Sequence, residues 1–109
     1  MESILTSIKL MLGIPEECED FDSQVVMHIN SVLFVLNQMG VGTKGFRIED
    51  STSEWSEFIP YDSNLEAVKS YVYLKTRLLF DPPSGAAMDA ANRLIAELEW
   101  RLYVAGDST

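Results

Sequence analysis

The residue types that carry most enzymatic chemistry are scarce in this chain. His28 is the only histidine and Cys18 the only cysteine, and no Cys/His pair has the spacing of zinc ligands. Cys18 lies in the acidic run PEECEDFD (15–22), where neighbouring carboxylates disfavour the thiolate that a nucleophile needs. His28 falls within an apolar helical pattern, where a structural role is the simpler interpretation. We therefore expect a protein that is not an enzyme and uses no metal or cofactor.

Two short stretches look like ligand-binding loops but lack the required residues. EDFD (19–22) has neither the central glycine nor the closing glutamate of an EF-hand calcium loop. GVGTKG (40–45) follows no strand and lacks the Gly-Lys-Ser/Thr ending of a phosphate-binding loop. We interpret the second stretch as a flexible loop, and we expect neither calcium nor a nucleotide to bind.

The charge of the chain argues against a protein that grips nucleic acid. The net charge is −9 over 109 residues, and residues 1–62 hold 11 acidic and 3 basic residues. Most of the acid lies in two loop-like stretches, PEECEDFD (15–22) and EDSTSEWSE (49–57). Such a surface repels phosphate backbones. A solvated acidic surface is the plainest explanation of these stretches.

Four segments carry the apolar spacing of helices. They cover residues 3–12, 22–39, 64–80 and 85–104. Each begins beside a residue suited to capping a helix N-terminus, and one of the caps is a Ser63–Glu66 capping box. The other expected caps are Ser3, Asp22 and Ser84. With 47% hydrophobic residues in 109, the chain is expected to form one domain over 1–109.

The last two helices are separated by an abrupt corner. Asp81, Pro82, Pro83 and Ser84 follow the apolar run RLLF. Proline lacks an amide hydrogen and its ring clashes with the preceding turn, so the helix must end there. Because the connection is short, the two helices should pack antiparallel as an αα-hairpin. We therefore predict a mainly all-α fold, a small helical bundle closed by this hairpin.

An irregular insert at about 41–62 interrupts the helical pattern. GFRIE alternates as a short β segment does, and SEWSEFI has the spacing of one or two helical turns capped by Ser53. The insert is rich in aromatic residues, which either cover the helices of the same chain or form a docking surface. The candidates for docking are Phe46, Trp55, Phe58 and Tyr61.

Some apolar residues fall outside the stripes that a single chain would bury. Met27, Phe34 and Val35 lie off the main stripe of the 22–39 helix, and Trp100 lies to one side of the stripe of the last helix. A helix that is apolar on more than one face is usually buried on more than one face. We expect another subunit to cover these residues. Lys69, Lys75 and Arg77 add a basic flank to the same set of interface candidates.

The sequence resembles the small head–tail connector, or adaptor, proteins of tailed bacteriophages and prophages. The resemblance covers most of the chain in order, and the pattern Y.YLK.RLLFDPP followed by ELEWRL is its most specific part. The matching stretches are SILTSIKLMLGI (3–14), HINSVLFVLNQMGVG (28–42), NLEAVKSYVYLKTRLLFDPP (64–83) and LIAELEWRL (94–102). The insert at 43–63 is where such proteins are expected to vary.

The resemblance implies a structural virion protein at the neck, made in the cytoplasm of the bacterial host. Such adaptors form a ring of about a dozen copies beneath the portal protein. The ring extends the DNA channel without binding DNA specifically, offers a platform to the next connector, stopper or tail protein, and involves no membrane. The family fold is a helical bundle, in agreement with the expectation from periodicity.

A second function class fits the same composition. A small acidic helical module that binds or inhibits a host protein by imitating the charge of DNA would also carry a large negative charge. Such a protein spreads its carboxylates over a duplex-like face, whereas here they concentrate in two loops. This distribution favours the connector, and the acidic module remains the alternative.

Overall fold

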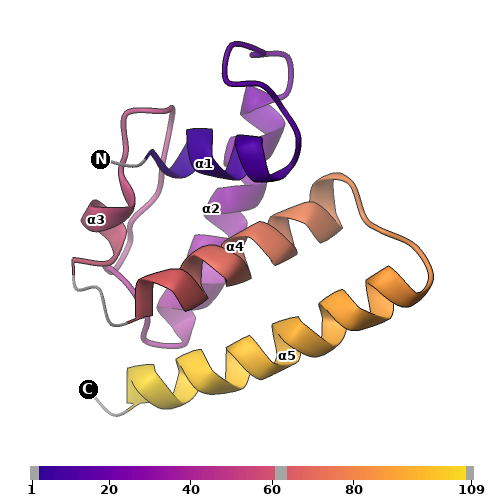
Figure 1. The fold of residues 1–109 in the computed structure, drawn as a ribbon. Helices are drawn as coiled ribbons and strands as arrows, with labels where there is room; N and C mark the ends of the chain where they lie inside the picture. Colours follow the sequence, from indigo (N-terminus) through magenta and orange to yellow (C-terminus); the bar gives the residue numbers. More distant parts are fainter. Residues whose placement is uncertain (1–2, 61–63, 108–109) are drawn as a thin grey trace.

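The computed structural model describes residues 3–60 and 64–107 and shows five helices (Figure 1). Within these residues no strand forms, and one isolated antiparallel bridge joins Ser3 to Glu54. The all-α fold predicted from periodicity is confirmed. The helices are α1 (Ile4–Met11), α2 (Asp22–Gln38), α3 (Trp55–Phe58), α4 (Leu65–Phe80) and α5 (Ala86–Asp107).

The helices form a thin molecule with α4 at its centre. The molecule measures 40 × 35 × 19 Å along its principal axes. Helix α4 packs on α2 with one face and on α5 with another, and α1 lies across α2 and α4. In Figure 1 α5 runs antiparallel to α4 and forms the outer edge of the molecule. Because α5 packs mainly on α4, most of its circumference faces outward.

The core lies where α1, α2 and α4 meet. Helix α2 contributes five of the six residues in the apolar stripe expected from its spacing, namely Val25, Ile29, Val32, Leu33 and Leu36, while the sixth, Met39, lies at the C-cap and is partly buried. Helix α4 contributes Val68, Tyr71 and Val72. By contrast, α5 buries Ile95, Leu98 and Leu102, and none of its residues 86–94 is buried. Leu94, which the sequence places in the buried stripe, is exposed.

Glycine ends both of the first two helices in the same way. Gly40 follows the C-cap of α2 with a φ of 83°, the left-handed conformation that glycine adopts most easily. Its amide donates to Asn37 O at 3.0 Å, and the Val41 amide donates to Leu36 O at 2.9 Å. This pair of bonds is a Schellman motif, and it buries Val41 against the core. Gly13 ends α1 by the same pattern.

The structure confirms one of the expected helix caps and corrects three. Ser3 caps α1, since its Oγ accepts from the Thr6 amide at 3.2 Å. Asp22 is the first residue of α2 instead of its cap. Glu54, in a capping box with Glu57, replaces Ser53 as the cap of α3. Helix α5 begins after Gly85, whose carbonyl accepts from the amide of Met88 at 3.1 Å, so Ser84 lies one residue too early.

The capping box predicted at Ser63 and Glu66 lies partly outside the described residues, because Ser63 is not among them. Asn64 precedes α4 and makes no side-chain capping hydrogen bond. At the other end of α4 the corner forms where the prolines predict it. Helix α4 ends at Phe80, and Asp81, Pro82, Pro83 and Ser84 lie between the helices.

The insert adopts an irregular path because two asparagines of α2 hold its backbone. Asn30 Nδ2 donates to Ile48 O at 2.9 Å, and its Oδ1 accepts from the Ile48 amide at 2.7 Å. One side chain thus replaces the partner strand that a β segment would need. The short β segment expected around GFRIE is therefore not formed in the described part of the insert.

Asn37 holds the neighbouring loop. Its Nδ2 donates to Val41 O at 3.0 Å and Thr43 O at 3.1 Å, and its Oδ1 accepts from the Gly45 amide at 2.9 Å. Asn30 and Asn37 are seven residues apart and so lie on one face of α2. The GVGTKG stretch, expected to be a flexible loop, is tied down by this second asparagine.

Candidate interaction surfaces

Two of the four aromatic residues proposed for docking belong to the core instead. Trp55 is 2% exposed and Phe58 is fully buried. The Trp55 indole donates to Ser7 Oγ at 2.8 Å, and the Phe58 ring packs over Gly42, where an added Cβ would clash with it. α3 therefore covers the helices of its own chain. Phe46 is half-buried against Phe58, and Tyr61 lies outside the described residues.

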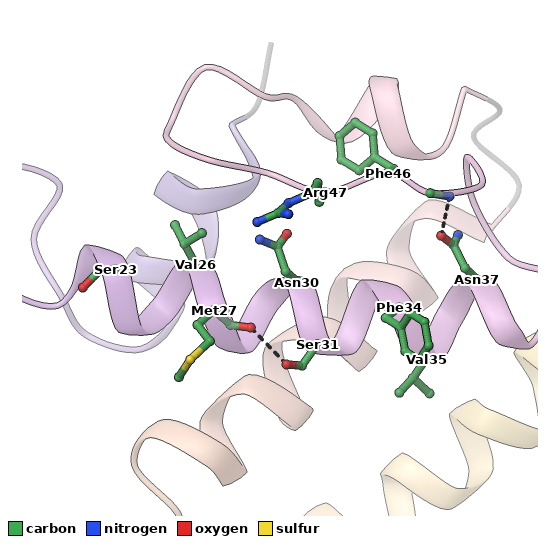
Figure 2. Close-up of a pocket in the computed structure, with 11 residues that line it drawn as sticks. Ser23, Val26, Met27, Asn30, Ser31, Phe34, Val35, Asn37, Phe46 and Arg47 are labelled. Carbon is green, nitrogen blue, oxygen red and sulfur yellow. Dashed lines mark hydrogen bonds between the residues drawn. The ribbon is translucent and has the colours of Figure 1, made fainter.

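The apolar residues off the main stripe of α2 are exposed. Phe34 is 63% exposed and Met27 58%, and Val35 is exposed as well. They border an open groove of about 880 Å³ between α2 and the insert. In Figure 2 Met27 and Val35 project from the side of α2 turned away from the insert, Phe34 lies in front of the helix, and Phe46 and Arg47 come from the insert. We call this surface the α2 groove; its remaining lining includes Ser23, Val26, Asn30, Ser31, Asn37 and Gly45.

A second uncovered apolar surface lies on the outward side of α5. Trp100 is 66% exposed, the largest exposed fraction among the large hydrophobic residues that the structure describes. Leu94, Tyr103 and Val104 are also exposed. An open hollow beside Trp100 is lined entirely by α5 residues, Glu97, Arg101 and Val104 among them. We call this surface the α5 ridge.

The basic residues of α4 do not form one flank. At about 100° per residue, Lys69 and Arg77 lie roughly 80° apart on the helix surface, with Tyr73 between them. Arg77 donates to the Tyr73 hydroxyl at 3.3 Å. Lys75 points about 160° away from Arg77 by the same geometry. As an interface candidate, Lys75 therefore belongs to a different side of α4 from the other two.

The two acidic stretches of the sequence meet in space. A hollow of about 600 Å³ is lined by Glu16, Glu19 and Asp22 from the first stretch and by Glu49 and Asp50 from the second. Thr52 donates to Asp50 through both its amide, at 2.9 Å, and its hydroxyl, at 2.5 Å, and these bonds lower the pKa of Asp50. One side of the molecule therefore concentrates negative charge.

The described residues form no cluster of metal-ligating side chains. Across 3–60 and 64–107, no group of three or more histidine, cysteine or acidic side chains is placed to hold a metal ion. Within 3–60 and 64–107, Tyr71 stands out because its pKa is strongly raised, and its hydroxyl donates to Glu99 Oε2 at 2.8 Å. Burial, and then the contact with Glu99, raises the pKa of Tyr71. This bond joins α4 to α5. Because Tyr71 is fully buried, its hydroxyl is not available to a ligand in solvent.

Comparison with known proteins gives the class of this protein. The family model for phage connector proteins matches residues 4–109. The chain therefore belongs to the phage connector protein family, whose role is that of structural proteins of the head–tail connection. Searches of curated proteins and of solved structures gave no match. No helix in the described ranges is long and apolar enough to cross a membrane.

Sequence reasoning missed the polar residues that position the insert. Asn30 and Asn37 recur seven apart in the most apolar helix of the chain, and polar residues at that spacing share one helix face. Two polar residues on one face of an apolar helix indicate that their side chains hold the backbone of a neighbouring segment against α2. Lys9 was also missed as a core residue. It is 3% exposed, and nothing in its sequence neighbourhood distinguishes it from a lysine in water.

Proposed function

We propose that this protein assembles as an oligomeric ring of about a dozen copies at the virion neck. The ring docks beneath the portal protein, extends the DNA channel, and presents a platform to the next connector, stopper or tail protein. The observation that carries the proposal is the family match over residues 4–109 in a chain with two large apolar surfaces uncovered.

The uncovered surfaces support assembly because their exposure is unfavourable in a lone chain. Phe34 and Trp100 are each more than 60% exposed, and covering a large apolar side chain contributes about 1.5–3 kcal/mol. The α2 groove and the α5 ridge are carried by different helices. A ring needs two different complementary patches on every subunit, and this chain provides two.

The charge of the chain suits a channel through which DNA passes without binding. The net charge is −9, and acidic walls repel the phosphate backbone. The acidic hollow concentrates carboxylates from residues 16–22 and 49–50 on one side of the molecule. The alternative of an acidic inhibitor rests on the same charge, and no further observation favours it.

The test is to mix the purified protein with the portal protein of the same phage. We expect a stable complex by size-exclusion chromatography with light scattering, and a ring beneath the portal in negative-stain images. The disabling variant Trp100→Asp should fold normally and fail to complete the ring. A protein that stays monomeric in the presence of the portal and never joins it would contradict the proposal. A pull-down that recovers a host nuclease or repressor, and no portal, would favour the acidic module.

A further inference from the structure

We propose that the α5 ridge of one copy occupies the α2 groove of the next copy. This inference rests on the proposed ring and deepens it, because it names the two surfaces that pair between neighbours. The occupant of the groove is thus a second copy of this chain, entering through Trp100.

The shapes of the two surfaces suit each other. The α2 groove is an open hollow of about 880 Å³ bordered by Met27, Phe34 and Val35. The α5 ridge is one side of a single helix, on which Trp100, Tyr103 and Val104 follow one another at helical spacing. Docking of a helix side into an apolar groove is a common mode of recognition. Tryptophan is among the residues that most often dominate such contacts.

The charged residues of the two surfaces allow one contact of opposite sign, since the groove carries Arg47 and the ridge carries Glu97 beside Arg101. Arg47 is the only charged side chain among the described residues that line the α2 groove. In a chain of net charge −9, a groove with one arginine and no carboxylate favours an acidic partner. Glu97 lies three residues before Trp100 and borders the same hollow. When Trp100 enters the groove, Glu97 is the carboxylate of the ridge that can meet Arg47.

Glu97 remains available for that contact. Its present partner is Arg101, whose Nη2 lies 2.9 Å from Glu97 Oε1, and both side chains are more than half exposed. Exposed pairs of this kind contribute little, and a carboxylate can accept from more than one donor. Arg47 can therefore add to the pair without breaking it.

The pairing determines the kind of assembly. A contact between unlike surfaces leaves every bound copy with one free groove and one free ridge, so that copies add in one direction until a ring closes. A contact of the groove with itself would stop at a dimer. The two arrangements therefore respond differently to single substitutions.

The test uses two variants that each disable one surface. Phe34→Asp places a carboxylate in the groove, and Trp100→Asp does the same on the ridge. Both residues are exposed, so the subunit should fold, as circular dichroism can verify. We expect each variant alone to associate at least about 30-fold more weakly than the unchanged chain, measured by sedimentation velocity in concentrated solution. Mixing the two variants should restore a dimer, because one supplies an intact ridge and the other an intact groove.

Two further measurements sharpen the test. Leu10→Asp, at an exposed position on α1 outside both surfaces, is the matched control and should associate like the unchanged chain. In a Cys18→Ser background, Ser31→Cys in one chain and Arg101→Cys in another should form a disulfide on mixing. A chain carrying both cysteines should give a ladder of covalent oligomers. These disulfides trap even brief contacts.

Several results would overturn the pairing. They are a mixture of the two variants that stays monomeric, an association unaffected by Trp100→Asp, and cysteine chains that cross-link no faster when folded than the same chains do when denatured. Failure of the proposed function is distinguishable, because it appears as a lack of portal binding. A chain that binds the portal while its groove and ridge do not pair would refute only this inference.

Discussion

The ammonium of Lys9 lies 2.7 Å from Asp22 Oδ1, inside the fold. The same nitrogen donates to Glu16 O at 3.0 Å and to Cys18 O at 2.6 Å. One buried cation therefore connects α1, the acidic loop that follows it and the first residue of α2. The carboxylate of Asp22 is stabilised a second way, because a negative charge in the first turn of a helix interacts favourably with the helix dipole.

Replacing this cation should destabilise the fold strongly. In Lys9→Met the side chain keeps its length, while Asp22 and two carbonyl oxygens lose their partner. The side chain of Asp22 is about one-third exposed while its paired oxygen Oδ1 is buried, so water recovers only part of the loss, and we expect about 2–4 kcal/mol. Urea denaturation measures the difference. Lys44→Met, at an exposed lysine of the insert, should change stability by less than about 0.5 kcal/mol. Equal stability of the two variants would show that the buried contacts contribute nothing.

Asn30 should contribute substantially to the stability of the fold, although it is a polar residue in an apolar helix. Asn30→Ala removes both partners of Ile48, whose side chain is fully buried. Leaving a donor and an acceptor unpaired should cost about 2–3 kcal/mol. Hydrogen exchange should show faster exchange of the Ile48 amide in the variant. Asn92→Ala, at an exposed asparagine of α5, is the control. An Ile48 amide that stays equally protected in Asn30→Ala would refute this role.

The Tyr71–Glu99 contact predicts a loss of stability at alkaline pH. The pKa of Tyr71 is raised in the fold, so the folded chain holds this proton more tightly than the unfolded chain does. The contribution is complete below about pH 10, the ordinary pKa of tyrosine, and is lost as the pH rises through the higher folded value. Stability measured by urea should therefore fall more steeply above about pH 10 in the unchanged chain than in Tyr71→Phe. Parallel curves would exclude the mechanism.

The two tryptophans should report assembly separately. Trp55 is buried and hydrogen-bonded to Ser7, whereas Trp100 is largely exposed. Acrylamide should quench one emitting population in the free subunit and leave the other protected. Assembly into the ring should protect Trp100 as well and shift its emission to shorter wavelength. Trp100→Phe identifies the signal, since this variant should lack the quenchable population. An unchanged quenchable fraction in the assembled ring would mean that Trp100 stays in solvent.

The helices and the hairpin corner were predictable because local physics determines them. The apolar spacing of α2, the glycines after α1 and α2, and the Pro82–Pro83 pair act within one or two turns of chain. The exposed position of Met27 and Phe34 also follows from their place off the main stripe. These features need no knowledge of what packs against the helix.

The insert was less predictable because distant residues determine it. Whether Trp55 covers its own chain or a partner depends on Ser7, 48 residues away. The path of Ile48 depends on one amide of α2. Asp22 has the side chain of a helix cap, but the buried Lys9 draws it into an ion pair instead. Sequence spacing shows which residues are apolar or capable of capping, and it does not show which of several partners they meet.

The most direct test of the account is an image of the assembled neck by electron cryomicroscopy, at a resolution that shows side chains. The account predicts a ring of this protein against the portal, with Phe34 and Met27 of every copy covered by a neighbour and Trp100 of that neighbour lying in the groove. A neck in which these three side chains face solvent in every copy, or one that lacks this protein, would contradict the central claim.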